Sequence, residues 1–561
     1  MAGRARLFFL RPAELSVIVA LGIAQAAILV AWVLLIWQAV DSIEAMRGDI
    51  RAPLPWLGGL LFVALANAVL RSLEFSICER IGFLTVRRLR MHIYRHMLGM
   101  APRQIQHRSR GSLLLRMTGD LTMLRTWISR GIGRGTIGAI VLAVGLAAIA
   151  YLSPLMAISA ALIFAAGAAA SLTLGRRLRR LTAVVRRRRS LLASNIDEQI
   201  NSLAVVQLFG RAGGEYSRLS QQNDAMTLAL VREAKVRGRM RGIAAGTGWV
   251  AVVAVLAAGL YEVSEGYITL GMLIAAAAGV RHLAGPVRSL GFAHDYWRRA
   301  SISRKKILEF LASGSRPLSS PLHNRLKVRR GKIQFDDVYV PSALHGVSAT
   351  AQSGERIAIT GPLGAGKSTL LGLVGRLVEP SAGEVLIDGT PLPSVTLESS
   401  QREVGMVSGD LPLMRGSVRR NVSYRRPSAT EAEIWQVLAA CGLEELVARL
   451  HEGLDTWITE GGKNFSTGER QRIALARAIM GYPRILLLDE PTTNLDAEST
   501  EIFHEVIARY PGTVFLATHD PAEAALMDRV WRLENGRLVE QSAAPAGASD
   551  AREGLLIASL G

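Results

Sequence analysis

Residues 361–369 read Gly-Pro-Leu-Gly-Ala-Gly-Lys-Ser-Thr, which fits the pattern G-x-x-x-x-G-K-[ST] of a phosphate-binding loop. A strand-like run ends at Thr360, and an apolar helix is expected from Leu370 to Leu377. The glycines let backbone N–H groups point at a phosphate near the N-terminus of that helix. We therefore expect nucleotide phosphates to be bound by Gly361, Gly364, Gly366, Lys367, Ser368 and Thr369.

Two side chains of this loop have more specific expected roles. Lys367 supplies positive charge to the β- and γ-phosphates, and the Ser368 hydroxyl is a ligand for Mg²⁺. A continuous apolar run, residues 485–488, is typical of a parallel strand buried on both faces, and Asp489 follows it. Asp489 is thus predicted to meet the Mg²⁺ of the nucleotide, so ATP and Mg²⁺ are the expected cofactors.

Two further residues are predicted to be catalytic. Glu490 adjoins Asp489 and is placed to polarise the attacking water. His519 follows another buried strand, residues 514–517, and is placed to donate to the γ-phosphate. A lone histidine is a weak signal, but its place one strand after the Asp-Glu pair makes the role persuasive.

The first 290 residues contain six apolar stretches of near-spanning length, because a bilayer core needs about 20 apolar residues in a helix. They are residues 15–37, 56–77, 135–152, 155–175, 243–261 and 267–284. The segment 176–241 carries 15 Arg and Lys residues, and the segment 80–134 is also basic. This pattern predicts a multi-pass protein of the cell inner (plasma) membrane with both long loops, and the nucleotide-binding domain, in the cytoplasm.

The formal net charge of +20 has two possible explanations, nucleic acid or anionic lipid. The basic residues lie between membrane spans with little aromatic interleaving, which favours a solvated face near anionic lipid over nucleic acid. The spans also exclude a soluble ATPase of the DNA-repair type.

Composition changes after the last span. The expected domains are a six-helix transmembrane domain at 1–310, a linker at 311–330, a nucleotide-binding domain at 331–541 and a flexible tail at 542–561. The fold class is therefore an α-helical transmembrane domain joined to an α/β P-loop NTPase domain.

Taken together, these motifs resemble the ABC transporter superfamily, in its exporter-type half-transporter form. Residues 465–472 (Phe-Ser-Thr-Gly-Glu-Arg-Gln-Arg) stand where the family has its signature, LSGGQ followed by Gln-Arg, and Asp496 closes the D-loop Asn-Leu-Asp. The resemblance implies an ABC-type ATPase whose ATP lies between the phosphate loop of one domain and the signature of another. Ser466, Gly468 and Asp496 are then ATP-binding residues, and a dimer is required.

Three sites depart from the family pattern: the Q-loop, the signature and the adenine-stacking position. Gly409 stands where a glutamine should ligate Mg²⁺ or position water, and Thr467 replaces a signature glycine. Glu469 for glutamine is a milder change. The aromatic that stacks on adenine has no clear counterpart, and Tyr339 is only a candidate.

These departures leave alternatives open. Intact Glu490 and His519 beside an altered signature favour a heterodimer with unequal ATP sites over a homodimer. The expected function is ATP-driven efflux of an unidentified lipid, drug-like or other small molecule. The alternative is a low-turnover ATP-binding regulatory or channel-like membrane subunit.

Overall fold

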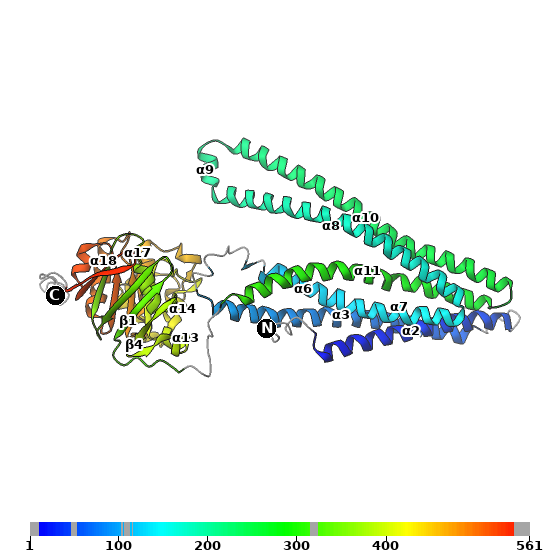
Figure 1. Ribbon diagram of the computed structural model, residues 1–561, viewed down its shortest axis with the longest axis horizontal. Helices are drawn as coiled ribbons and strands as arrows, with labels where there is room; N and C mark the ends of the chain where they lie inside the picture. The colour runs from blue at the N-terminus through cyan, green and yellow to red at the C-terminus, as the bar shows by residue number, and fades with distance from the viewer. Residues whose placement is uncertain are drawn as a thin grey trace. The chain divides into compact units, whose positions relative to one another are not determined.

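The computed structural model describes residues 10–45, 53–101, 105, 113, 114, 116–314 and 324–543, without the side chains of Glu44, Ala45 and His294. The chain divides into two compact units, residues 1–94 with 111–313 and residues 95–110 with 314–561. The first unit is helical and the second contains the sheets (Figure 1). Residues 315–323 of the predicted linker and 544–561 of the predicted tail lie outside the described residues.

Six helical segments of the first unit are long and apolar enough to cross a membrane, as predicted. Their elements are α2 (Pro12–Ala45), α3 (Leu54–Leu98), α6 (Leu121–Thr126) continuing into α7 (Arg134–Leu152), α8 (Pro154–Asn201), α10 (Ala212–Ser264) and α11 (Leu270–Ala312). At about 1.5 Å per residue, the 48 residues of α8 exceed a bilayer core of about 30 Å. The basic stretches after the predicted spans are therefore largely continuations of the same helices.

The turn between the third and fourth spans is as tight as its sequence predicts. Ser153 caps α8 by accepting a hydrogen bond from the Met156 N–H at 3.1 Å, and Pro154 occupies the first turn, where its missing N–H is harmless. Ser153 also donates to the Glu262 carboxylate of α10. This turn therefore joins three helices at one end of the unit.

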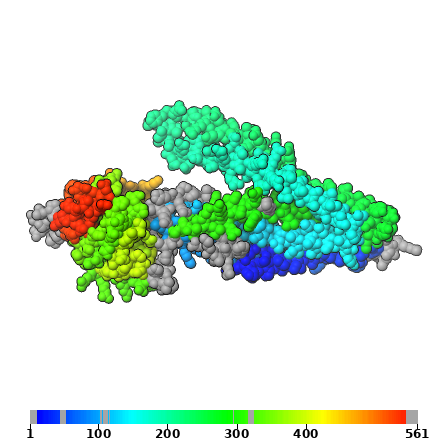
Figure 2. Space-filling view, viewed as in Figure 1, coloured from blue at the N-terminus to red at the C-terminus, as the bar shows by residue number. Residues whose placement is uncertain are grey.

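Helices α8 and α10 pack along each other and are joined by the short α9 (Leu203–Leu208). The ends of α8 and α10 that α9 joins diverge from the bundle of α2, α3, α7 and α11, as the ribbon diagram (Figure 1) and the space-filling view (Figure 2) show. A buried carboxylate joins the pair, because Glu233 of α10 accepts from Thr182 of α8 at 2.8 Å and from Arg237 at 2.6 Å. Large apolar side chains on the outer surface, such as Phe62 and Leu162, are exposed as lipid contact requires.

The second unit is built on a six-stranded sheet of order β12-β11-β3-β10-β9-β6 and a four-stranded antiparallel sheet of order β2-β1-β4-β5. The larger sheet contains β3 (Arg356–Thr360), β6 (Val404–Ser408), β9 (Ile485–Asp489), β10 (Thr513–Ala517), β11 (Arg529–Glu534) and β12 (Arg537–Ala543). The smaller contains β1 (Ile333–Val340), β2 (Leu344–Ala351), β4 (Ala382–Ile387) and β5 (Thr390–Pro391), and β7 (Gly416–Ser417) pairs with β8 (Trp457–Ile458). The helices are α12 (Lys367–Val374), α13 (Leu397–Arg402), α14 (Val418–Val422), α15 (Glu431–Ala440), α16 (Glu444–Arg449), α17 (Thr467–Ile479), α18 (Ala497–Arg509) and α19 (Pro521–Ala525).

The centre of the larger sheet confirms the predicted buried strands. β10 pairs in parallel with both β3 and β9, and the apolar side chains of all three are buried, which their uninterrupted apolar sequences require. β6 pairs in parallel with β9, so Ser408 lies opposite Asp489. Since parallel strands end at the same edge of a sheet, the residues after β3, β6, β9 and β10 come together there.

Part of the predicted linker packs on the second unit. Leu326 is buried in its core, and the Asp388 carboxylate accepts the backbone N–H groups of residues 329–332 at 2.8–3.3 Å. These contacts fix the chain before β1 enters the sheet.

Candidate functional site

The phosphate loop lies at the carboxyl edge of the larger sheet, between β3 and α12. Its glycines are required by close backbone contacts: a Cβ on Gly361 would lie 2.1 Å from the Leu533 carbonyl oxygen, and one on Gly366 2.6 Å from that of Ala343. Both also have positive φ. α12 begins at Lys367 and ends at Val374, three residues before the predicted end, because Arg376 takes a left-handed conformation.

The Lys367 side chain is folded back into the loop. Its Nζ donates to the Gly361 carbonyl oxygen at 2.8 Å and lies 4.0 Å from Glu490 Oε1. The side chain is almost fully buried, at 6% exposure, although Leu363 in the same loop is 96% exposed. A buried ammonium beside an open loop is suited to an anionic ligand.

Two hydroxyls flank the Asp489 carboxylate. Ser368 Oγ donates to Oδ1 at 2.9 Å and Ser408 Oγ to Oδ2 at 3.3 Å. Burial raises the pKa of Asp489, the two hydroxyls lower it, and the neighbouring charges of Glu490 and Asp410 raise it again, so the net shift is upward. A carboxylate with this balance is stabilised in its charged form by a cation.

The Mg²⁺ prediction fits this arrangement. In the part of the chain that the structure describes, no three His, Cys, Asp or Glu residues form a metal cluster. Mg²⁺ usually takes one or two protein ligands and completes its shell with water and phosphate oxygens. Ser368 and Asp489 are the residues that would hold it.

The two predicted catalytic side chains face each other. His519 Nδ1 lies 3.8 Å from Glu490 Oε1, and the imidazole is 68% exposed. Glu490 has a φ of +48°, and its N–H donates to the Ala517 carbonyl oxygen of the adjacent strand at 2.9 Å. The sheet edge therefore holds the Glu490 backbone in a conformation that is uncommon for a residue with a Cβ.

A buried carboxylate behind this edge escaped the sequence analysis. Glu523 of α19 accepts hydrogen bonds from Thr492 and Thr518 and lies 3.7 Å from His504 Nε2. Burial alone would raise its pKa, but the partners His504, Thr492 and Thr518 outweigh burial and lower it. Glu523 thus connects the segments that follow Glu490 and precede His519, and no local sequence signal reveals it.

The sequence analysis also did not predict Ser408 as a site residue, although its position beside Gly409 could have indicated it. Ser408 is the last residue of β6, and its hydroxyl donates to Asp489. A Cβ added to Gly409 would meet no atom within 4 Å, and its φ is not in the left-handed region. Position 409 could therefore carry a side chain, so backbone geometry does not explain the glycine.

The signature residues form a second, separate group. Ser466 caps α17 in a reciprocal box, since its Oγ accepts from the Glu469 N–H at 3.2 Å and Glu469 accepts from the Ser466 N–H at 2.7 Å. Glutamate and glutamine both suit this box, which explains why the change at 469 is mild. A Cβ on Gly468 would lie 2.6 Å from Ser499 Oγ and 3.1 Å from Asp496 Oδ1.

Thr467 departs from the signature on the exposed side of the same turn. It is the first residue of α17, and its hydroxyl accepts from Arg470 at 3.0 Å. Within the described residues, no hydrogen bond or ion pair joins Ser466, Thr467 or Gly468 to the phosphate loop. The sequence-predicted site therefore falls into two groups on one chain.

Tyr339 lies near the end of β1, and the β1–β2 turn approaches the loop at Gly366. Its side chain is 39% exposed. Adenine stacking on Tyr339 stays a prediction.

Comparisons with known proteins agree with both units. Residues 344–493 match the family described as ABC transporter, and residues 15–287 match the ABC transporter transmembrane region. A multidrug efflux ATP-binding/permease protein of Mycobacterium bovis is 29% identical over 507 residues, which cover 89% of this chain and 42% of that protein. An ATP-dependent lipid A-core flippase of Desulfotalea psychrophila is 26% identical over 471 residues, 83% of this chain and 82% of the flippase.

A solved structure of a bacterial Atm1-family ABC exporter with ATP bound matches the fold. Its TM-score is 0.81 at 23% identity, and the match covers 98% of each chain. The chain spans about two fifths of the length of the mycobacterial multidrug efflux proteins it matches.

Proposed function

This chain belongs to the ABC transporter family, with a membrane-spanning unit joined to a nucleotide-binding domain, and on that premise we propose that it hydrolyses ATP to drive export of a small molecule across the inner membrane. The observation that supports this most directly is the grouping of Lys367, Asp489, Glu490 and His519 at one sheet edge. It would be one half of a dimer, with its nucleotide-binding domain in the cytoplasm.

The mechanism assigns each side chain one task. Backbone N–H groups of the loop and the Lys367 ammonium bind the ATP phosphates. When ATP binds, the ammonium gives up its hydrogen bond to the Gly361 carbonyl oxygen and donates to phosphate oxygens instead. Ser368 and Asp489 would hold Mg²⁺, which would neutralise charge on the phosphates. Glu490 accepts a hydrogen bond from the attacking water, and His519 donates to the γ-phosphate.

A partner chain is needed because Ser466 and Gly468 lie apart from the loop. We propose a head-to-tail dimer in which the signature of each chain covers the ATP of the other. ATP that binds the closed dimer more tightly than the open one shifts the membrane helices between two states. A non-identical partner is favoured, because Thr467 at the start of α17 adds a branched side chain where close approach to a phosphate is required.

Turnover of Glu490→Gln tests the assignment. The purified assembly in lipid nanodiscs should lose at least about a hundredfold in ATP hydrolysis, since a general base typically contributes about 10²–10⁴-fold. Glu398→Gln removes an exposed carboxylate of the same domain that pairs with Arg402, and it should leave turnover unchanged.

The second candidate, a low-turnover regulatory or channel-like subunit, is favoured by Gly409 and Thr467. It would be supported if the wild-type protein hydrolysed ATP at a rate near background and Glu490→Gln left that rate unchanged. That result would contradict the proposed ATP-driven export.

A further inference from the structure

The membrane unit contains a cavity of about 1160 Å³ between α7, α8 and α11, with one contact from α10. Sites for drug-sized ligands are usually about 300–1,000 Å³, so this cavity admits a larger molecule. Every lining residue belongs to the helical unit.

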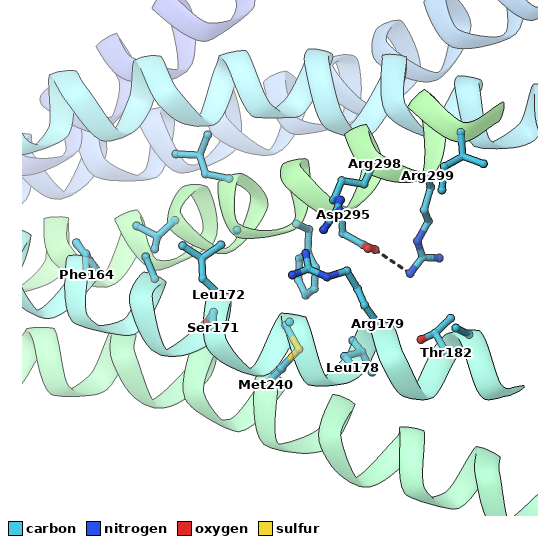
Figure 3. Close-up of a pocket in the computed structure, with 18 of the residues that line it drawn as sticks. Phe164, Ser171, Leu172, Leu178, Arg179, Thr182, Met240, Asp295, Arg298 and Arg299 are labelled. Carbon is cyan, nitrogen blue, oxygen red and sulfur yellow. Dashed lines mark ion pairs between the residues drawn. The ribbon is translucent and has the colours of Figure 1, made fainter. Parts of the chain in front are cut away.

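The lining changes character along the cavity. Leu146, Phe164 and Leu172 are apolar lining residues, and Figure 3 shows Phe164 well away from Arg179 and Arg298. Along α8 the change falls where the predicted fourth span, residues 155–175, gives way to the basic stretch. The predicted fourth span therefore places the apolar part of α8 in the bilayer core and Arg179 near its cytoplasmic edge.

The basic end has an excess of positive charge from two facing helices. Its basic side chains are Arg179, Arg186 and Arg187 of α8 and Arg298, Arg299 and Lys306 of α11. The acidic residue Asp295 accepts from Arg299 at 2.7 Å, one turn away on α11. Among the residues that the structure describes, no ion pair is made by Arg179, Arg186 or Arg298. Like charges facing one another repel unless an anion lies between them.

Membrane topology alone does not account for this arrangement. The positive-inside rule places arginines near helix ends but does not require them to face a cavity. Arg189, on the same helix, satisfies the rule equally and lines no part of this cavity. The convergence of two helices on one cationic end therefore calls for a ligand.

We propose that this cavity binds an anionic amphiphile as the exported cargo, with acyl chains against the apolar end and a phosphate or carboxylate headgroup between Arg179 and Arg298. Guanidinium groups bind both headgroups in a two-pronged geometry. The cargo assignment rests on the proposed export function, whereas the binding assignment stands on the cavity itself.

Binding is tested on the full-length protein purified in dodecyl maltoside, without nucleotide, by calorimetric titration with dodecyl phosphate. The neutral detergent already presents the same twelve-carbon chain in excess, so the titration reports the headgroup. Inorganic phosphate is the control titrant, because it has the headgroup but no alkyl chain. Dodecyl phosphate should bind saturably, and inorganic phosphate should bind at least about tenfold more weakly.

Three variants locate the site. Arg179→Gln with Arg298→Gln should weaken dodecyl phosphate binding by about tenfold or more, because each removes a charged hydrogen bond. The single variant Arg298→Lys keeps the positive charge and should retain part of the affinity for dodecyl phosphate. Retained affinity would show that the double variant binds weakly because it lost charge, not because it misfolded. Arg189→Gln is the matched control and should bind as the wild type does. Equal affinity in the double variant, or equal binding of inorganic phosphate, overturns the site.

Cargo is tested in proteoliposomes with fluorescent phosphatidylglycerol, against a phosphatidylcholine analogue of the same chains. ATP should move the anionic lipid between leaflets, and the double variant should lose this movement. Saturable binding without movement, in protein that hydrolyses ATP, would identify a resident lipid and overturn the cargo role. Binding in protein that hydrolyses no ATP would instead contradict the proposed function and leave the binding site supported.

Discussion

At the residue scale, the end of β6 contains the clearest departure from the family. Ser408 donates to Asp489, and the following Gly409 leaves open space where the family has a glutamine. The Ser408 hydroxyl supplies a polar contact on that side of Asp489 but does not extend as far as a glutamine amide. We infer that the site retains its metal-side geometry and lacks one group that orients water.

Gly409→Gln tests this inference. The added Cβ meets no neighbouring atom, since nothing lies within 4 Å of its position. Turnover should rise by about tenfold, corresponding to about 1.4 kcal/mol of transition-state stabilisation. Gly409→Ala supplies the Cβ without the amide and is the control, and equal turnover of the two variants would contradict the role given to the amide.

At the element scale, Glu523 connects segments that the chain separates. It joins Thr492, just after β9, to Thr518, just after β10, and thereby supports the positions of Glu490 and His519. Glu523 is 4% exposed, so its charge is stabilised by these partners and not by water. The sheet edge that contains Glu490 and His519, the predicted catalytic pair, is therefore stabilised by a helix, α19, for which the sequence predicted no role.

Glu523→Gln should destabilise the protein and slow turnover together. The glutamine amide nitrogen replaces one carboxylate oxygen that accepts a hydrogen bond from Thr492 or Thr518. We expect the free energy of unfolding to fall by about 2 kcal/mol. Thermal unfolding at pH 7 should begin several degrees lower than in the wild type. Glu505→Gln removes a partly exposed carboxylate that lies 3.9 Å from Arg509, and as the control it should change neither quantity.

The pH dependence gives a second readout of the same variant. The folded pKa of Glu523 is lowered, so its stabilisation is present above the unfolded pKa of about 4.3 and is lost as pH falls through the folded value. The stability difference between wild type and Glu523→Gln should therefore shrink below about pH 4. A difference that stays constant with pH would contradict the ionised state of Glu523.

At the scale of the whole molecule, the two groups of nucleotide-site residues are separate on one chain. The phosphate loop, Asp489, Glu490 and His519 form one group, and Ser466, Gly468 and Asp496 form the other. A second chain is the simplest source of the missing half of each site. In the proposed head-to-tail dimer, Thr467 faces the partner's site and not the one built on this chain's Glu490.

Copurification identifies that second chain. The tagged protein, extracted in mild detergent from the cells that naturally express it, should carry a second half-transporter in equal amount. We expect that partner to have glycine at the position of Thr467 and a replaced residue at the position of Glu490. Recovery of this chain as a dimer with itself would contradict the unequal sites, and an untagged extract controls for non-specific capture.

Much of this protein was predictable from sequence because its signals are local. The phosphate loop, the buried strands and the six apolar spans are runs in which neighbouring residues specify one conformation. The structure confirms the strands that end at Thr360, Asp489 and Ala517 and the six spans, whereas phosphate binding by the loop stays a prediction. The departures at Gly409 and Thr467 were visible for the same reason. Their roles, like those of Glu490 and His519, remain predictions.

Tertiary structure alone decided what depends on distant residues meeting. Ser408 and Asp489 are 81 residues apart and touch only because β6 and β9 pair in register. Glu523 meets Thr492 across the end of the same sheet. Arg179 and Arg298 line one cavity only because α8 and α11 pack in one unit. Composition and periodicity report which face of an element is buried, whereas the pairing of elements sets which side chains share a site.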